Sequence, residues 1–409
     1  MNNKGHVIYI MLSFYIMLMP LNNSFEVAAM MNGMLPYGGW SIQLTPTLLK
    51  LYKDFFLVFF ILFILFSFLK YNYCREVFSK VTLLPVFIFL LIVFSFSYFY
   101  ILNDDVFRAI LGLRSYLSLI YFLVGVSIGV CFDFRKIKFA FIFVFMLHLI
   151  MQIVQNIQGV GLPVFGEVRS PGIFIVPATA GVFSLLALFY FHQTKNRLLL
   201  FFSVGSLVLS TSTIGLLSVT IYIVYYLSDR FFNRNLIAKI IVLVCLLLLS
   251  ISFFYYYAAQ LSGRGNAVFE SLGGRISIMT SFFENASIED FMYGGRFGLV
   301  TAQAVLSKND FGFIADNTFL GVYASMGFFA VIFLILFTVF IFLRSENKFL
   351  AISFLLYAMS SNVFELSPVS QLLFLFIGIH IGASRMTAKN NKVRLVVYSE
   401  NVATKKYIL

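Results

Sequence analysis

Arginine side chains are the residues of this sequence best suited to binding an anion. Six of them lie in the segments expected outside the membrane or near the outer ends of apolar runs: Arg108, Arg114, Arg169, Arg264, Arg275 and Arg296. A guanidinium group is permanently charged, and its planar fork matches the oxygens of carboxylate and phosphate groups. We therefore expect several of these side chains to converge on one anionic group. The alternative is that each arginine only braces a loop or reaches toward the membrane surface.

Carboxylate groups near these arginines are candidates for acid–base or orienting roles. Asp316 precedes an apolar run, where it can cap a helix or accept a proton from a hydroxyl group. Glu167 lies two residues before Arg169 and can orient it. The pair Asp104-Asp105 is typical of a solvated turn, and the alternative is a pair that binds a metal ion or an acceptor substrate.

Histidine and cysteine residues give no metal-binding pattern. The 4 histidines and 3 cysteines are scattered, so we expect no metal ion, no cofactor and no disulfide framework. His148 and Gln152 are four residues apart in an apolar run, and Gln155 follows at helical spacing. We expect this polar stripe to make structural hydrogen bonds to neighbouring helices, with a cavity-lining role as the alternative.

The composition indicates that these residues are positioned by membrane helices. Hydrophobic residues make up 61% of the 409 residues and charged residues only 11%, against about 25% in soluble domains. The net charge of +12 does not indicate nucleic-acid binding, because the basic residues lie in short loops between apolar runs. We expect an all-α, polytopic membrane protein.

About twelve apolar runs are candidates for transmembrane helices, each needing roughly 20 residues. The predicted runs are 6–21, 54–69, 81–102, 110–131, 139–158, 172–191, 197–211, 213–228, 238–257, 317–343, 349–362 and 367–384. They form one transmembrane domain, 1–384, followed by a basic cytoplasmic tail, 385–409. The first run is interpreted as an uncleaved anchor, and a signal peptide is the alternative.

The distribution of basic residues predicts the orientation of the chain. If the N-terminus is cytoplasmic and the runs alternate, 20 of the 29 lysine and arginine residues fall in inner loops, as positive-inside sorting requires. Both termini are then cytoplasmic. The polar segment 258–316 becomes one large periplasmic loop, and 22–53 becomes a smaller outer loop.

Several outer segments resemble the signature of the O-antigen polymerase and ligase superfamily. They are Arg169–Phe174, Ser210–Gly215, Gly274–Arg275, Met292–Gly298 and Asp316–Gly327. The ligase branch usually carries His before the Asn that opens the last segment. Here Asp316 precedes Asn317, which is more similar to the polymerase branch.

The resemblance implies a Wzy-type glycosyltransferase in the bacterial inner membrane, independent of metal ions. It would join undecaprenyl-pyrophosphate-linked oligosaccharide repeats of O-antigen or a similar surface glycan, for lipopolysaccharide or polysaccharide biosynthesis. The implied partners are this lipid-linked oligosaccharide, membrane lipid and a chain-length regulator protein, with no nucleic acid. The implied catalytic residues are Arg169, Arg275 and Asp316, and the implied substrate-binding residues are Arg264, Arg296, Arg114, Asn317, Glu167 and Tyr293.

Three alternatives remain open from the sequence. One is an O-antigen ligase that transfers finished polymer to another acceptor. The second is a flippase or transporter of the same lipid-linked oligosaccharide, which would need charge and broken helices near the middle of the bilayer. The third is a glycosyltransferase that uses single polyprenyl-phosphate sugars and a metal bound at Asp104-Asp105.

Overall fold

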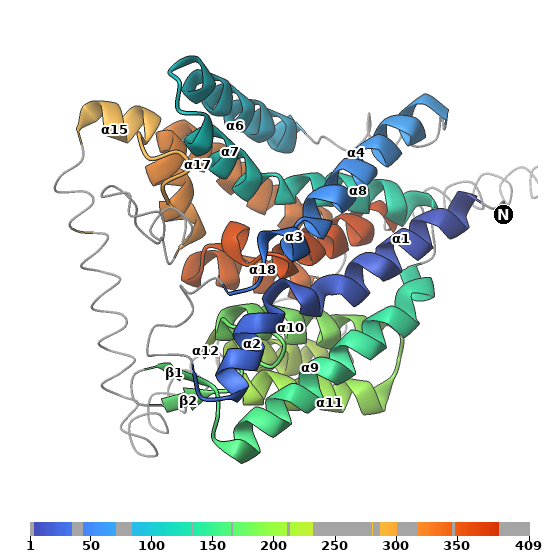
Figure 1. Ribbon diagram of the computed structural model, residues 1–409. Helices are drawn as coiled ribbons and strands as arrows, with labels where there is room; N and C mark the ends of the chain where they lie inside the picture. Colours follow the sequence, from blue (N-terminus) through green and yellow to red (C-terminus); the bar gives the residue numbers. More distant parts are fainter. Residues whose placement is uncertain are drawn as a thin grey trace, which may run out of the picture.

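The computed structural model describes residues 4–34, 44–70, 84–131, 134–164, 167–210, 213–231, 280, 287–300, 317–345 and 348–383. Within these ranges the regular secondary structure is helical apart from one short hairpin (Figure 1). The N-terminal half of the chain contributes α1 Lys4–Leu18, η1 Met19–Asn23, α2 Ser24–Met31, α3 Thr47–Lys50, α4 Tyr52–Lys70, α6 Leu84–Leu102, α7 Val106–Tyr116 and α8 Ser118–Cys131. The remaining elements are η3 Phe134–Ile137, α9 Lys138–Gln158, β1 Leu162–Val164, β2 Glu167–Arg169, α10 Pro177–Gln193, α11 Arg197–Leu209, α12 Thr213–Phe231, α15 Ile288–Tyr293, α17 Thr318–Arg344, α18 Lys348–Ser360, η4 Val363–Glu365 and the helix Val369–Ala383.

The apolar runs predicted from the sequence correspond to these helices, except for 238–257, which lies outside the described residues. Five segments of the described chain are long and apolar enough to cross a membrane: Val7–Met31, Leu84–Leu102, Val106–Gly129, Lys138–Gln158 and Thr318–Arg344. Large apolar side chains also cover outward faces, as along α6, where Phe87, Leu91 and Phe94 are exposed. These features indicate a helical membrane protein.

One boundary differs clearly from the prediction. The sequence predicted that 22–53 is an outer loop, but helix continues through η1 and α2 to Met31, and α3 forms at Thr47–Lys50. Pro20 does not end the helical stretch, because it lies in the first turn of η1, where a missing N–H costs no hydrogen bond.

Helix α10 is the centre of one half of the bundle. Its side chains from Thr179 to Phe191 are buried on all sides, as expected for a helix that is apolar around its whole circumference. Helices α9, α11 and α12 pack against it. In the other half α17 packs on α6, α15 and α18, and α4 packs on α8.

Helix α8 crosses the final helix through small residues. A Cβ atom at Gly125 or Gly129 would overlap the backbone of the final helix, and one at Gly378 or Gly382 would overlap the backbone of α8. The two G-x-x-x-G spacings therefore allow the closest approach of two helices, as in many membrane proteins.

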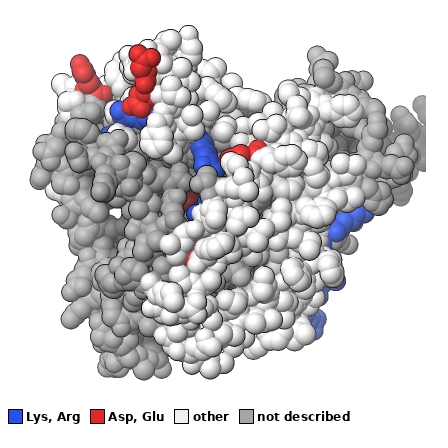
Figure 2. Space-filling model, in the orientation of Figure 1, with Lys and Arg blue, Asp and Glu red and all other residues white. Residues whose placement is uncertain are grey.

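The charged residues of the described surface are few. Figure 2, in the orientation of Figure 1, shows a mostly uncharged face with basic side chains along its right edge, on the side where α9 begins. Acidic side chains gather at the upper left, over α6, α7 and α15. The β1–β2 hairpin and α15 both lie on the left of Figure 1, away from the N-terminus.

Candidate functional site

Arg169 is the last residue of a hairpin that leads into α10. Strand β1 pairs with β2 in antiparallel register, with Leu162 opposite Arg169 and Val164 opposite Glu167. Arg169 is half-buried. This hairpin was not predicted from the sequence, because Phe165-Gly166 between the two strands is not a typical hairpin-turn pair and only Gly166 favours a turn.

The loop after Arg169 is fixed by polar side chains of α9. The Gln155 amide clasps the Gly172 backbone: Gly172 N donates to Oε1 at 2.8 Å, and Nε2 donates to the Gly172 carbonyl at 2.9 Å. Gly172 adopts a φ of +65°, and a Cβ there would overlap the His148 ring. The backbone N–H of Ile173 donates to His148 Nδ1 at 3.4 Å. Only glycine fits this position.

The same network reaches α10 and α11. Because His148 Nδ1 is an acceptor, we assign the proton to Nε2, which donates to Ser184 Oγ at 3.3 Å. The Oγ atoms of Ser184 and Ser206 are hydrogen-bonded at 2.7 Å, and Ser206 Oγ donates to Gln152 Oε1 at 2.6 Å. Gln152 Nε2 donates to the Ser170 carbonyl at 3.3 Å. The predicted structural hydrogen-bonding role of His148 and Gln152 is confirmed, and the loop that carries Arg169 is what they hold.

A second loop carries Arg296 and joins the break in α17. Helix α17 is interrupted at Gly327, with φ 77° and ψ −170°, a conformation that favours glycine. In an unbroken helix the Ala324 carbonyl would accept from residue 328. Here it accepts from the backbone N–H of Arg296 at 3.0 Å. A Cβ at Gly327 would overlap the Met292 carbonyl, so the loop and the break fit closely together.

Phe297 anchors this loop in the helix bundle. Its side chain is fully buried, with ring centroids 5.7 Å from Tyr100, 5.8 Å from Phe96 and 6.3 Å from Tyr116. The Arg108 guanidinium donates to the carbonyl of Phe297 at 2.7 Å and to that of Gly295, and lies 4.3 Å from the Tyr100 ring centroid. Arg108 thus braces a loop, which was the alternative to binding an anion that the sequence left open.

Asn317 caps α17. Its Oδ1 accepts from the backbone N–H groups of Phe319 at 2.8 Å and Leu320 at 3.2 Å, and its Nδ2 donates to the Met359 carbonyl at 3.0 Å. We expected Asp316 either to cap this helix or to accept a proton. The capping residue is Asn317, which is one of the preferred N-cap types. A substrate contact by Asn317 stays a prediction.

Arg114 has the partner that a charge in an apolar run requires. Its guanidinium lies 2.9 Å from Asp54 at the start of α4, and the two side chains expose 34% and 40% of their surface. Asp105 accepts from the backbone N–H of Arg108 at 3.2 Å and caps α7. This supports the turn interpretation of Asp104-Asp105.

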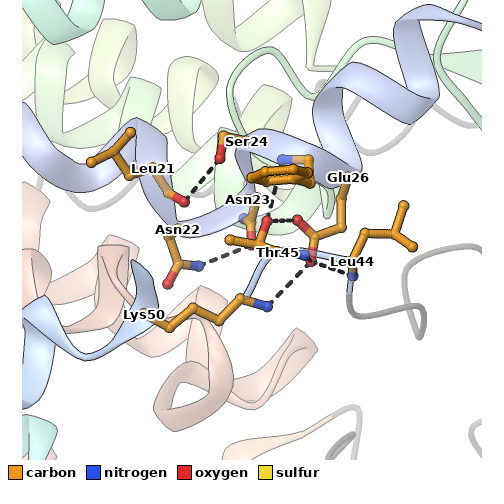
Figure 3. Close-up of polar contacts among 9 residues, drawn as sticks. Leu21, Asn22, Asn23, Ser24, Glu26, Leu44, Thr45 and Lys50 are labelled. Carbon is orange, nitrogen blue, oxygen red and sulfur yellow. Dashed lines mark hydrogen bonds and ion pairs between the residues drawn. The ribbon is translucent and has the colours of Figure 1, made fainter. Parts of the chain in front are cut away.

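One buried carboxylate was not predicted from the sequence. Glu26 on α2 is fully buried and accepts from the backbone N–H groups of Leu44 and Thr45, both at 3.0 Å. Figure 3 shows it pointing toward Thr45 and Lys50, and it contacts the Thr45 hydroxyl and lies 3.2 Å from Lys50 Nζ. The available signal was an acid inside an apolar stretch, which needs a partner.

The remaining predicted site residues divide into two groups. Arg264, Arg275 and Asp316 lie outside the described residues, and so does the side chain of Glu167. Tyr293 is 63% exposed at the end of α15, and Arg296 is half-exposed beside it. Within the described ranges no cluster of three or more His, Cys, Asp or Glu side chains could hold a metal ion.

Arg169 and Arg296 are thus held by two separate sets of contacts. Arg169 depends on α9, α10 and α11, whereas Arg296 depends on α15, α17 and the Phe297 contacts with α6 and α7. Comparisons with protein-family models, with curated proteins and with solved structures found no match to the chain.

Proposed function

We propose that this chain is a membrane-embedded glycosyltransferase that polymerises lipid-linked oligosaccharides, as the resemblance to O-antigen polymerases implies. About twelve spans would cross the inner membrane, with 258–316 on the periplasmic side and both termini in the cytoplasm. A hydroxyl group at the non-reducing end of one repeat would attack the anomeric carbon of the growing chain. Undecaprenyl pyrophosphate would leave with the bonding electrons.

The observation that carries the proposal is the rigid attachment of the Arg169 loop. Its backbone is held by buried hydrogen bonds from Gln152 and Gln155. A cation carried on a fixed backbone needs less reorganisation when charge develops on a leaving pyrophosphate, and such preorganisation is often the largest catalytic effect. Arg275 is assigned the same role by the resemblance alone, and Asp316 is the candidate base.

The orientation also fits the distribution of charge. The basic side chains at the right edge of Figure 2 lie where α9 begins, which positive-inside sorting would place in the cytoplasm. The Arg169 hairpin follows the other end of α9. The two arginine-bearing loops would then face the periplasm, where the lipid-linked repeats are joined.

The experiment is a glycan profile of strains that carry single variants in an otherwise deleted background. Arg169→Ala and Arg275→Ala should reduce the surface glycan to one repeat unit, and Arg169→Lys should restore little because it lacks the planar fork. Arg197→Ala is the matched control, since Arg197 is exposed at the start of α11 on the expected inner side. A long-chain ladder that persists in Arg169→Ala would refute the assignment.

A second candidate is transport of the same lipid-linked oligosaccharide, which the break in α17 at Gly327 favours. Interrupted helices form substrate sites in many transporters. The loop at Arg296 already satisfies the Ala324 carbonyl at this break, so we place polymerisation first. Lipid-linked repeats trapped on the inner leaflet of a deletion strain would favour transport instead.

A further inference from the structure

The start of α4 brings together five charged side chains from four parts of the chain. Lys50 ends α3, and Lys53 and Asp54 occupy the first turn of α4. Glu26 approaches from α2 and Arg114 from α7. The hydroxyl group of Tyr121 donates to the Lys53 carbonyl at 3.2 Å and so ties this turn to α8.

Each carboxylate in the cluster already has a cation. Glu26 pairs with Lys50 at 3.2 Å and also accepts the backbone N–H groups of Leu44 and Thr45 (Figure 3). Asp54 pairs with Arg114 through a single guanidinium nitrogen at 2.9 Å. The other nitrogen atoms of the Arg114 fork are not used in that contact.

Lys53 adds a third basic group to a cluster in which the described residues supply two carboxylates. It exposes only 8% of its surface, and the described part of the chain shows no ion pair for its ammonium group. Its charged neighbours are two cations, Arg114 and Lys50, and one anion, Asp54. A buried ammonium group without an anion is costly, and in a membrane protein such a residue is a site candidate by default.

We propose that Lys53 and Arg114 form a second phosphate-binding site, which takes the phosphate or pyrophosphate group of a lipid. The bound anion would balance the Lys53 charge and accept from the Arg114 nitrogens that Asp54 leaves open. The identification of this lipid as polyprenyl pyrophosphate rests on the proposed function; the phosphate chemistry does not. The Asp54 carboxylate, which contacts Arg114, would limit how tightly an anion binds.

The test measures binding of geranylgeranyl pyrophosphate to the purified full-length protein in phosphatidylcholine nanodiscs. Lys53→Met should weaken binding about tenfold or more, as expected for a lost charged hydrogen bond, and Lys53→Arg should retain it. Lys138→Met is the control, because Lys138 is exposed at the start of α9. Inorganic pyrophosphate and phosphatidylglycerol are tested as competitors, and either one competing equally well would assign the site to free phosphate or to bulk lipid headgroups.

Two results would overturn the proposal. One is equal affinity in Lys53→Met and Lys138→Met. The other is a Lys53→Met protein that, without ligand, melts well below the wild type, because replacing a buried amine that has no ion pair with an apolar side chain of similar length should preserve or raise stability. Binding is measured without chain elongation, so an unchanged glycan ladder in Arg169→Ala would refute the polymerase proposal and leave this result intact.

Discussion

Replacing Gln155 by leucine tests whether its buried side-chain amide on α9 holds the Arg169 loop. The two side chains are similar in size, so packing of α9 changes little. The substitution removes both hydrogen bonds to Gly172, the 2.8 Å bond from its N–H and the 2.9 Å bond to its carbonyl. Both backbone groups then lie buried against an apolar side chain.

The expected cost follows from these two orphaned groups. A buried donor or acceptor that loses its partner costs about 1–3 kcal/mol, so the two together cost about 2–6 kcal/mol. The loop can avoid part of this cost by moving until Gly172 finds other partners. Such a movement displaces Arg169, three residues earlier, so we expect lower stability together with a shortened glycan.

The assay pairs thermal unfolding of the detergent-solubilised protein with the glycan ladder of the same variant. Gln158→Leu is the matched control, because Gln158 is exposed at the end of the same helix and should tolerate the change. Equal melting temperatures for Gln155→Leu and Gln158→Leu would refute the role of this amide. A destabilised Gln155→Leu protein that still makes long glycan would show that the position of Arg169 does not matter.

Two further predictions concern the Arg296 loop. Gly327→Ala should cost about 2–6 kcal/mol, from a backbone conformation reserved for glycine and from overlap with the Met292 carbonyl, whereas Gly205→Ala in α11 meets nothing within 4 Å and should be neutral or stabilising; equal melting temperatures would contradict this. Phe297→Ala should cost about 3–5 kcal/mol, because the ring is fully buried among three aromatic side chains, and Phe291→Ala, 44% exposed, should cost less in the same unfolding assay. The reverse order would show that Phe297 is not the anchor.

Helix positions could largely be predicted from apolar run length. The predicted run 139–158 corresponds to α9 at Lys138–Gln158, and 317–343 to α17 at Thr318–Arg344. The run 172–191 was less accurate, because α10 begins only at Pro177. Gly172 does not interrupt an apolar run, but it adopts a φ of +65°, which is not helical. Pro177 is favoured in the first turn of a helix, so the helix starts there. Hydropathy does not register either constraint.

The polar contacts of the site were predictable only in part. Spacing along α9 correctly indicated that His148 and Gln152 share a face, but their partners lie far along the chain: Ser184 is 36 residues beyond His148, and Ser206 is 54 residues beyond Gln152. Glu26 similarly depends on Thr45 and Lys50, which lie 19 and 24 residues later in the chain. Helical periodicity places a residue on a face, whereas the opposing partner is decided by helix packing, which this single sequence does not encode in any local pattern.

The Arg169 and Arg296 loops meet the same physical requirement, which is that buried backbone groups need hydrogen-bond partners. A loop that leaves a membrane helix exposes backbone groups that lipid cannot hydrogen-bond, so the protein must supply partners. Gln155 does this for Gly172, and the Arg296 backbone does it for Ala324. Arg169 lies three positions before Gly172, and Arg296 itself supplies the N–H that Ala324 accepts, so the requirement to satisfy the backbone also positions the backbone of the residue that carries the cation. Because the two sets of contacts come from different helices, each arginine is positioned by partners of its own.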